Sequence, residues 1–388
     1  MSTPTAVQNR TSLRRPHDER RLPWYHLLFT GLAGLLIAVA GLALVDALSV
    51  GSAIVLGFLL HLLLGWLYSL LREGPRWAAD RLVTLLVIGA FAVAMFPLLS
   101  LLWEVVRRGM TRVIAAKPSP LDFWTSDMSG IIGGADAGGV FHAAVGTLLI
   151  TLWASLISIP VGLFTAIFLV EYADHGWKRT LGAGVTFLVD VMTGIPSIVA
   201  GLFGLALFIA LMPDDSVRMG IMGAVALSLL MIPTVVRNSE EMLRLVPMDL
   251  REAAYALGVP KWLTIVKVVL RTAVAGLTTG ITLAIARVIG ETAPLLLTVG
   301  MVTSVNWNMF DGRMATLPTF INQQYRAGSA NCMSETVTNP ITQEVYSCSI
   351  ATNIDRAWAA AFTLIVIVMV LNIIARLISH YFSPKLSR

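Results

Sequence analysis

Long apolar stretches separated by shorter polar segments run through most of the chain. A helix that crosses the hydrocarbon core needs about 20 mostly apolar residues, because every backbone N–H and C=O must find its partner within the segment. The pattern therefore predicts an all-α polytopic membrane bundle of about eight transmembrane helices. We expect these spans at Leu27–Val45, Val50–Leu71, Leu82–Trp103, Val140–Val170, Ala183–Leu211, Met219–Val235, Val268–Gly300 and Ala357–Ile378.

The polar segments predict how the chain is oriented. Residues 1–23 form a basic stretch that we expect to be a disordered cytoplasmic tail. Lys and Arg favour the cytoplasmic side of a bilayer. Their distribution predicts that both termini are cytoplasmic, that the loop near residues 237–264 is cytoplasmic, and that a large loop at 301–356 is external.

Composition agrees with a membrane protein and narrows the chemistry. Hydrophobic residues make up 56% of the 388 residues and charged residues 13%, so a net charge of +5 indicates positive loops rather than nucleic-acid binding. Cys332 and Cys348 both fall in the loop predicted to be external, where oxidation is permitted, and a disulfide and two free thiols both remain open. Neither the cysteines nor the six His residues have the spacing of a metal site.

One short helix is predicted within the cytoplasmic loop. Asp249 is expected to cap its N-terminus and Glu252 to complete a capping box, while Gly258 provides a left-handed end. Apolar residues at i, i+3, i+4 and i+7 form a narrow stripe on this helix. Either an ordinary interfacial helix or a docking helix for another protein fits this pattern. The stripe consists of Leu250, Ala253, Ala254 and Leu257.

Three charged residues, Asp190, Arg287 and Glu291, fall inside predicted spans. A charge at a helix centre costs about 2.5–3.5 kcal/mol on insertion scales and normally faces a protein interior or a water-filled cavity. Arg287 and Glu291 are spaced i, i+4, so they could simply neutralise each other. Alternatively, Arg287 donates to an oxyanion while Glu291 holds the guanidinium between substrates; both interpretations can hold together. Kinks are predicted at Pro160, Pro196, Pro233 and Pro294.

Several motifs resemble one family of membrane proteins. Glu252-Ala253-Ala254 followed by Gly258 resembles the EAA loop of bacterial ABC-importer permeases, although Val268 and Arg271 replace the usual Ile and Pro further on. The segments at 146–152, 159–162, 171–172, 194–199 and 290–296, the last reading Gly-Glu-Thr-Ala-Pro-Leu-Leu, resemble the PstA permeases of phosphate-specific ABC import systems. This resemblance implies a six-helix permease domain at 81–388, two accessory transmembrane helices at 24–80, and a bacterial inner-membrane location.

The same resemblance implies a role and partners. Arg287, Glu291 and Asp190 are expected on a phosphate pathway, and Asp249–Gly258 on the surface that couples to an ATPase. The expected partners are a homologous PstC-like permease, two copies of a cytoplasmic PstB-like ATPase, an external PstS-like phosphate-binding protein and membrane lipid, with no nucleic acid. The chain has no Walker-type sequence, so it is expected to be non-catalytic and free of cofactors, with ATP and Mg on the partner ATPase. Two alternatives remain: a self-sufficient secondary carrier or anion channel, and a permease for sulfate or molybdate.

Overall fold

The computed structural model describes residues 22–23, 25–116, 119–131, 133–212, 217–329, 332, 334–341 and 343–382. Nearly all of the predicted tail at 1–23 lies outside these residues. The chain divides into two compact units, Met1–Leu102 and Trp103–Arg388. The division falls inside one long helix, α3 (Pro75–Ile114).

The first unit contains helices α1 (His26–Leu44) and α2 (Val50–Arg72) and most of α3 (Pro75–Ile114). The bounds of α1 and α2 agree with the predicted spans. Gly34 allows these two helices to approach closely, since a Cβ there would lie 2.8 Å from the backbone nitrogen of His61.

A buried carboxylate fastens the helix ends of this unit together. Glu73 accepts hydrogen bonds from Arg81 at 2.6 and 2.7 Å, from the hydroxyl of Ser69 at 2.7 Å and from the backbone N–H of Leu22 at 2.6 Å. Burial alone would raise the pKa of Glu73, but these bonds, chiefly those from Arg81, outweigh it and lower the pKa to about 2.

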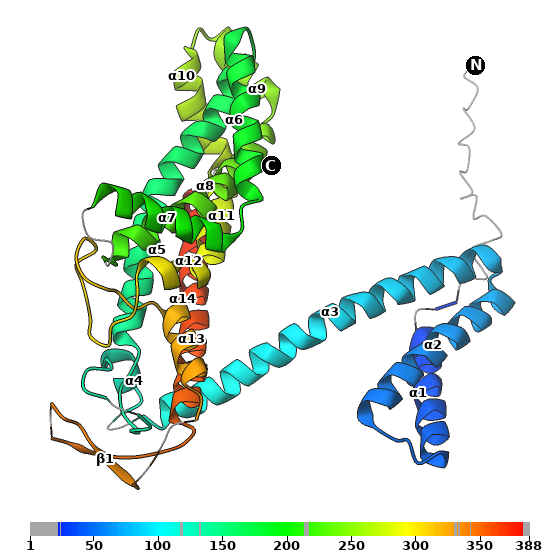
Figure 1. Cartoon of the computed structure of the whole chain (residues 1–388). Helices are drawn as coiled ribbons and strands as arrows, with labels where there is room; N and C mark the ends of the chain where they lie inside the picture. The colour runs from blue at the N-terminus through cyan, green and yellow to red at the C-terminus, as the bar shows by residue number, and fades with distance from the viewer. Residues whose placement is uncertain are drawn as a thin grey trace, which may run out of the picture. The chain divides into compact units, whose positions relative to one another are not determined.

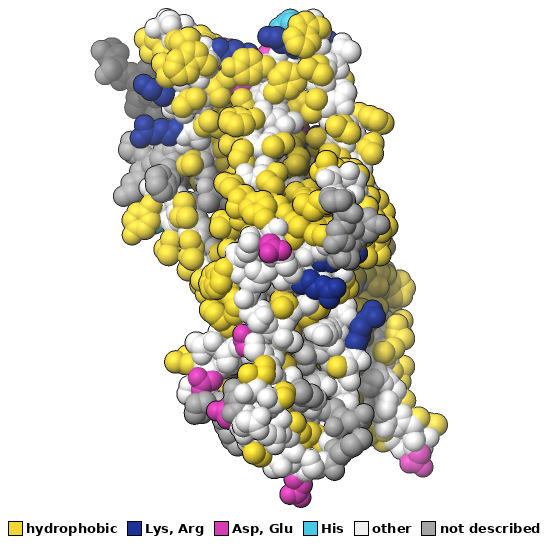
Figure 2. Space-filling view, turned by 60° about the vertical axis from the view of Figure 1, so that its left-hand side comes forward, with side chains coloured by type: hydrophobic (Ala, Val, Ile, Leu, Met, Phe, Trp, Pro, Cys, Tyr) yellow, Lys and Arg dark blue, Asp and Glu magenta, His cyan; other side chains and the backbone are white. Residues whose placement is uncertain are grey.

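The second unit is a helical bundle centred on α8 (Figure 1). α8 packs against α5, α7 and α11, and α14 packs against α11 and α13. α8 is the most deeply buried of the long helices described: 67% of its most apolar segment is buried, compared with 6% to 33% for the other long spans. Figure 2 shows a broad hydrophobic surface on one face, with carboxylates mostly towards one end. The helices are α4 (Asp122–Thr125), α5 (Phe141–Ile167), η2 (Phe168–Tyr172), α6 (Trp177–Thr193), α7 (Ser197–Leu211), α8 (Gly220–Arg244), α9 (Met248–Ala256), α10 (Lys261–Thr264), η3 (Ile265–Val269), α11 (Leu270–Val288), α12 (Ala293–Thr298), α13 (Leu317–Ala327) and α14 (Thr352–Phe382).

Within the described residues, seven helices are long and apolar enough to span a membrane, and one bent pair of helices could form an eighth span. The all-α polytopic prediction is therefore confirmed. Several predicted boundaries were wrong. α3 runs from Pro75 to Ile114, beyond both ends of the predicted span Leu82–Trp103. α8 continues to Arg244, so the first residues of the predicted 237–264 loop are helical. The predicted span Ala183–Leu211 is broken, with α6 and α7 bent by 106°. The predicted span Val268–Gly300 contains two breaks in α-helical geometry, at η3 and before α12.

The loop predicted to be external carries the small amount of β-structure. Strands β1 (Thr336–Thr338) and β2 (Val345–Ser347) pair antiparallel, and a disulfide joins Cys332 to Cys348. The glycine-rich segment before α5 is held against this loop, because the N–H of Asp136 donates to the carbonyl of Ser347 at 2.7 Å.

Candidate functional site

A polar cavity of about 200 Å³ lies where α6, α7, α8 and α11 meet. Arg287 and Glu291 line it together with the hydroxyl residues Thr193, Ser197 and Thr234. Polar groups of this kind are rare in an apolar bundle and normally mark a substrate or ion path. The remaining lining residues are Met192, Ile195, Leu230, Pro233 and Val288.

Two breaks in the membrane helices build this cavity. α6 ends at Thr193, and Pro196, which is the N-cap residue of α7, redirects the chain through the 106° bend. Proline cannot donate a backbone hydrogen bond and biases the preceding residue away from helical geometry, so a helix stops there. Ser197, the first residue of α7, therefore presents a helix N-terminus at the cavity, where partial positive charge favours anions.

The second break follows Arg287. α11 ends at Val288, and α12 begins at Ala293 with Pro294 in its first turn. α12 packs tightly on α7: a Cβ on Gly201 would lie 2.6 Å from the Cα of Pro294, so only glycine fits there. Pro160 and Pro233, by contrast, lie within the continuous helices α5 and α8.

The predicted pairing of Arg287 with Glu291 on one helix face was wrong. Because α11 stops between them, they lack the i, i+4 geometry of a helix, and they are not among the ion pairs of the described residues. Arg287 is exposed and makes no hydrogen bond or ion pair within the described part of the chain, while Glu291 is partly buried. Both side chains nevertheless face the same cavity.

Asp190 is not among the residues that line this cavity. It forms an ion pair with Arg237 of α8, whose guanidinium also donates to Glu240 at 2.9 Å. Glu240 in turn accepts from Arg244 at 2.8 Å. Asp190 and Arg237 lie about one helical turn from the cavity residues Thr193 and Thr234, in the direction of the end of α8.

The predicted coupling helix is present as α9. Its C-terminus matches the prediction: Gly258 has φ +76°, its N–H donates to Tyr255, and the N–H of Val259 donates to Ala254. This pair of bonds is a Schellman motif. The N-terminus differs, because Pro247 is the N-cap residue and no side chain caps the helix. Asp249 is an acidic residue of the first turn, so the predicted capping box with Glu252 was wrong.

The apolar stripe of α9 is divided between the protein and its surface. Ala254 is buried against the chain, whereas Leu250 and Ala253 are exposed and Leu257 is 83% exposed. Met248 and Trp262 are also exposed nearby. An exposed apolar cluster of this kind is typical of a surface that binds another protein.

Arg251, on α9, anchors this helix to the bundle. It forms an ion pair with Glu171 at 3.0 Å, and the two side chains are only 8% and 5% exposed. The same guanidinium donates to the carbonyls of Leu243 and Val246 at 2.9 Å, at the end of α8. α9 is thus fastened to α8 and to η2 at once.

A second contact joins the same regions. The ammonium of Lys261 lies 3.6 Å from a carboxylate oxygen of Asp174 and 5.1 Å from the ring centre of Tyr172. Both ends of the α9 region are therefore attached to the end of α5–η2.

Sequence reasoning did not assign these contacts. Arg251 lies in the segment expected to couple, but the pattern showed only the apolar stripe, and its partner Glu171 is remote in sequence. Arg237 was interpreted as a loop residue. Its spacing from Glu240 and Arg244 is helical and would have signalled that α8 continues.

A family model and curated relatives identify the family of this chain. Residues 158–388 match the model of the binding-protein-dependent transport system inner membrane component. Phosphate transport system permease protein PstA 1 of Mycobacterium tuberculosis (strain CDC 1551 / Oshkosh) is 42% identical over 303 residues, which cover 78% of this chain and 89% of the relative. PstA of Mycobacterium leprae (strain TN) is 41% identical over 298 residues, covering 77% and 88%. A chain of the inward-facing MetNI methionine ABC transporter aligns with a TM-score of 0.45 at 17% identity, over 63% of this chain and 95% of that chain.

Proposed function

Since this chain belongs to the family of binding-protein-dependent transport system inner membrane components, we propose that it is the PstA-type permease subunit of an ATP-driven importer for inorganic phosphate. Its relatives of that name align with it over most of their length. The chain is a multi-pass membrane protein and, as a transport permease subunit, is non-catalytic. We further propose that it resides in the bacterial inner membrane with both termini in the cytoplasm.

One observation carries the assignment of the substrate path: Arg287 faces a polar cavity at the N-terminus of α7 without an ion-pair partner in the described part of the chain. A guanidinium, nearby hydroxyl groups and a helix N-terminus all offer hydrogen-bond donors or positive potential to an oxyanion.

Glu291 gives the cavity a balancing negative charge. A site made only of donors would retain a phosphate dianion, whereas a carboxylate on the same cavity limits the affinity and favours release. Asp190 would act one turn further along, where it holds Arg237 of α8. We propose that this pair forms a second charged position between the cavity and the cytoplasmic end.

α9 would couple the permease to ATP hydrolysis. Its exposed apolar residues Leu250, Ala253 and Leu257 suit docking into a cleft of another protein, and Arg251 would transmit displacement of α9 to the bundle. The partners we propose are two copies of a PstB-like ATPase that binds ATP and Mg, a PstC-like permease and an external PstS-like binding protein. This chain itself would need no cofactor.

The test is phosphate uptake by the complete complex in proteoliposomes. Arg287→Gln is expected to abolish ATP-driven phosphate uptake while the complex still assembles, and Arg287→Lys to retain a fraction of it, because the charge remains but the planar donor array is lost. Arg271→Gln, at an exposed arginine of α11 that does not line the cavity, is the matched control. Normal uptake by an assembled Arg287→Gln complex would reject the proposed path.

The two alternatives give different results in the same system. A secondary carrier or channel would transport phosphate as the lone purified chain without ATP. A sulfate or molybdate permease would show ATP-driven uptake of labelled sulfate or molybdate. An excess of the unlabelled anion would suppress that uptake, whereas an excess of phosphate would not.

A further inference from the structure

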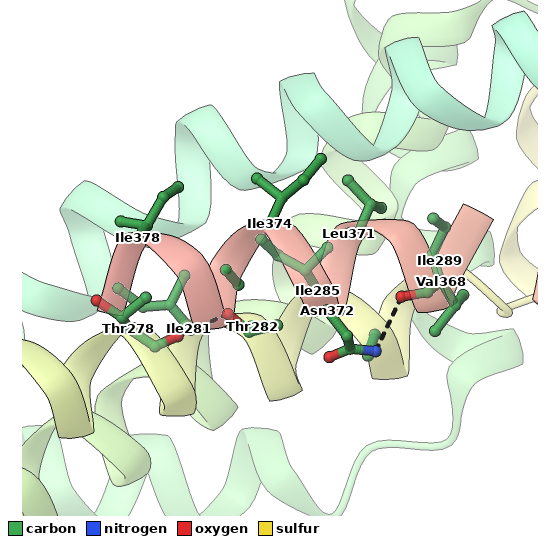
Figure 3. A pocket seen from close by; sticks show the side chains of 12 residues that line it. Thr278, Ile281, Thr282, Ile285, Ile289, Val368, Leu371, Asn372, Ile374 and Ile378 are labelled. Atoms are coloured by element: carbon green, nitrogen blue, oxygen red, sulfur yellow. Dashed lines mark hydrogen bonds between the residues drawn. The ribbon is translucent and has the colours of Figure 1, made fainter. Parts of the chain in front are cut away.

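An apolar groove of about 280 Å³ runs between α11 and α14 (Figure 3). Isoleucine side chains from both helices line it, with Ile281 and Ile285 on α11 and Ile374 and Ile378 on α14. Ile374 and Ile378 are also about half exposed on the outside of the bundle. The groove is therefore accessible from the outer surface of the bundle.

The groove continues into a second pocket of different chemistry. This pocket, about 570 Å³ in volume, is lined by Arg376 and His380 and by the hydroxyl residues Thr279 and Ser379. The two share Thr282, Asn372 and Ala375, so they form one continuous depression with an apolar part and a basic, hydroxyl-rich part. Arg376 has no hydrogen bond or ion pair within the described residues.

The basic part lies towards the end of the bundle that carries α9. Thr279 and Ser379 also line a neighbouring pocket with Asn238 and Glu241, which are in the last turns of α8. In the proposed orientation this is the cytoplasmic side, where basic pockets between membrane helices bind anionic lipid head groups. The carboxylate of Glu241 disfavours an anion in that neighbouring pocket, so the phosphate is assigned to the Arg376 end.

We propose that this depression binds one anionic phospholipid, with an acyl chain along the groove between α11 and α14 and the phosphate at Arg376. The volume favours a lipid over a protein segment. A helix with its side chains is about 10–12 Å across and cannot enter a groove of this volume between two packed helices, whereas a single acyl chain can. A cation at one end of an apolar groove also matches the amphipathic form of a phospholipid.

The probe is spin-labelled phosphatidylglycerol, compared with spin-labelled phosphatidylcholine, in vesicles that contain the complete complex. Electron paramagnetic resonance measures the immobilised fraction of each lipid and hence its relative association constant. The variants are Arg376→Gln, Arg376→Lys and Ala375→Trp, the last of which fills the junction of the two pockets. Arg271→Gln removes an exposed arginine of α11 outside the depression and serves as the matched control.

Arg376→Gln is expected to reduce the preference for phosphatidylglycerol over phosphatidylcholine by about fivefold, the effect of one basic residue near a membrane surface. Arg376→Lys and Arg271→Gln keep the preference, and Ala375→Trp lowers the immobilised fraction of both lipids. If Arg376→Gln leaves the preference for phosphatidylglycerol over phosphatidylcholine unchanged, the proposal is overturned. This test does not depend on Ala375→Trp, so it stands even if that variant fails to assemble. Efficient cross-linking of Ile374→Cys to the partner permease overturns it too, because a protein then covers the groove.

Discussion

Removing the guanidinium of Arg251 tests whether α9 is fastened to the bundle as the contacts indicate. Arg251→Met keeps much of the side-chain volume but leaves the carboxylate of Glu171 buried without its partner. It also deprives the carbonyls of Leu243 and Val246 of their donors. Loss of one partner from a buried ion pair typically costs about 3–5 kcal/mol. At about 1.4 kcal/mol for each tenfold change, detachment of α9 should become at least about 100-fold more frequent.

Hydrogen exchange of the α9 amides and the number of phosphate ions imported per ATP hydrolysed measure the two consequences. We expect faster exchange and a lower coupling ratio in Arg251→Met. The double variant Glu171→Gln/Arg251→Met should have slower α9 exchange and a higher coupling ratio than Arg251→Met, because no charge is then buried alone. Arg244→Met is the control: Arg244 is 63% exposed and pairs with Glu240, so its loss should cost no more than about 1 kcal/mol. Wild-type exchange and coupling in Arg251→Met would refute the reasoning.

Three further predictions concern other parts of the chain. Ala253→Glu places a charge on the exposed side of α9 and should abolish co-purification of the ATPase while the permease keeps its thermal stability; retained association and import would contradict a docking role. Because the pKa of Glu73 is about 2 in the folded unit, below its ordinary value of 4.5, its stabilising contribution is present above about pH 4.5 and is lost as the pH falls towards 2. The protection of amides around Arg81 against hydrogen exchange, measured relative to the intrinsic rate at each pH, should fall over that range, and this pH dependence should be weaker in Glu73→Gln. Cys332→Ser should destabilise the loop that carries β1 and β2 by about 3 kcal/mol, the value typical of a closed loop of about 15 residues, as limited proteolysis with and without reductant can show. Equal cleavage of both proteins under oxidising conditions would argue against it.

The sequence predicted those features that depend on local pattern. The apolar lengths located α1 and α2 closely, and Gly258 marked the end of α9 correctly. The sequence pattern was wrong where a helix is interrupted and the interruption decides the geometry. Pro196 was expected to kink one span, yet it separates two helices bent by 106°. The i, i+4 rule assumed a continuous helix through Arg287 and Glu291, whereas α11 ends at Val288.

Contacts between remote segments could not be derived from pattern at all. Glu171 and Arg251 are brought together by the packing of η2 against α8, because Arg251 also binds carbonyls at the end of α8. A single sequence shows an acidic and a basic residue, but it shows neither that they are buried nor that they meet. The same holds for Asp190, whose partner Arg237 lies on another helix.

α8 is the element through which displacement of α9 would reach the polar cavity at Arg287. Thr234 of α8 lines that cavity, Arg237 holds Asp190 of α6 one turn later, and the carbonyls at its end bind Arg251. Because α8 is the most buried of the long helices described, it is packed on several sides and would move as a unit. The π-helical segment η2 carries Glu171, the partner of Arg251 on α9, and the π-helical segment η3 follows α9 and α10 in the chain; such segments occur frequently at functional sites. We therefore expect the backbone to adjust at η2 and η3 while α8 carries the motion to Arg287.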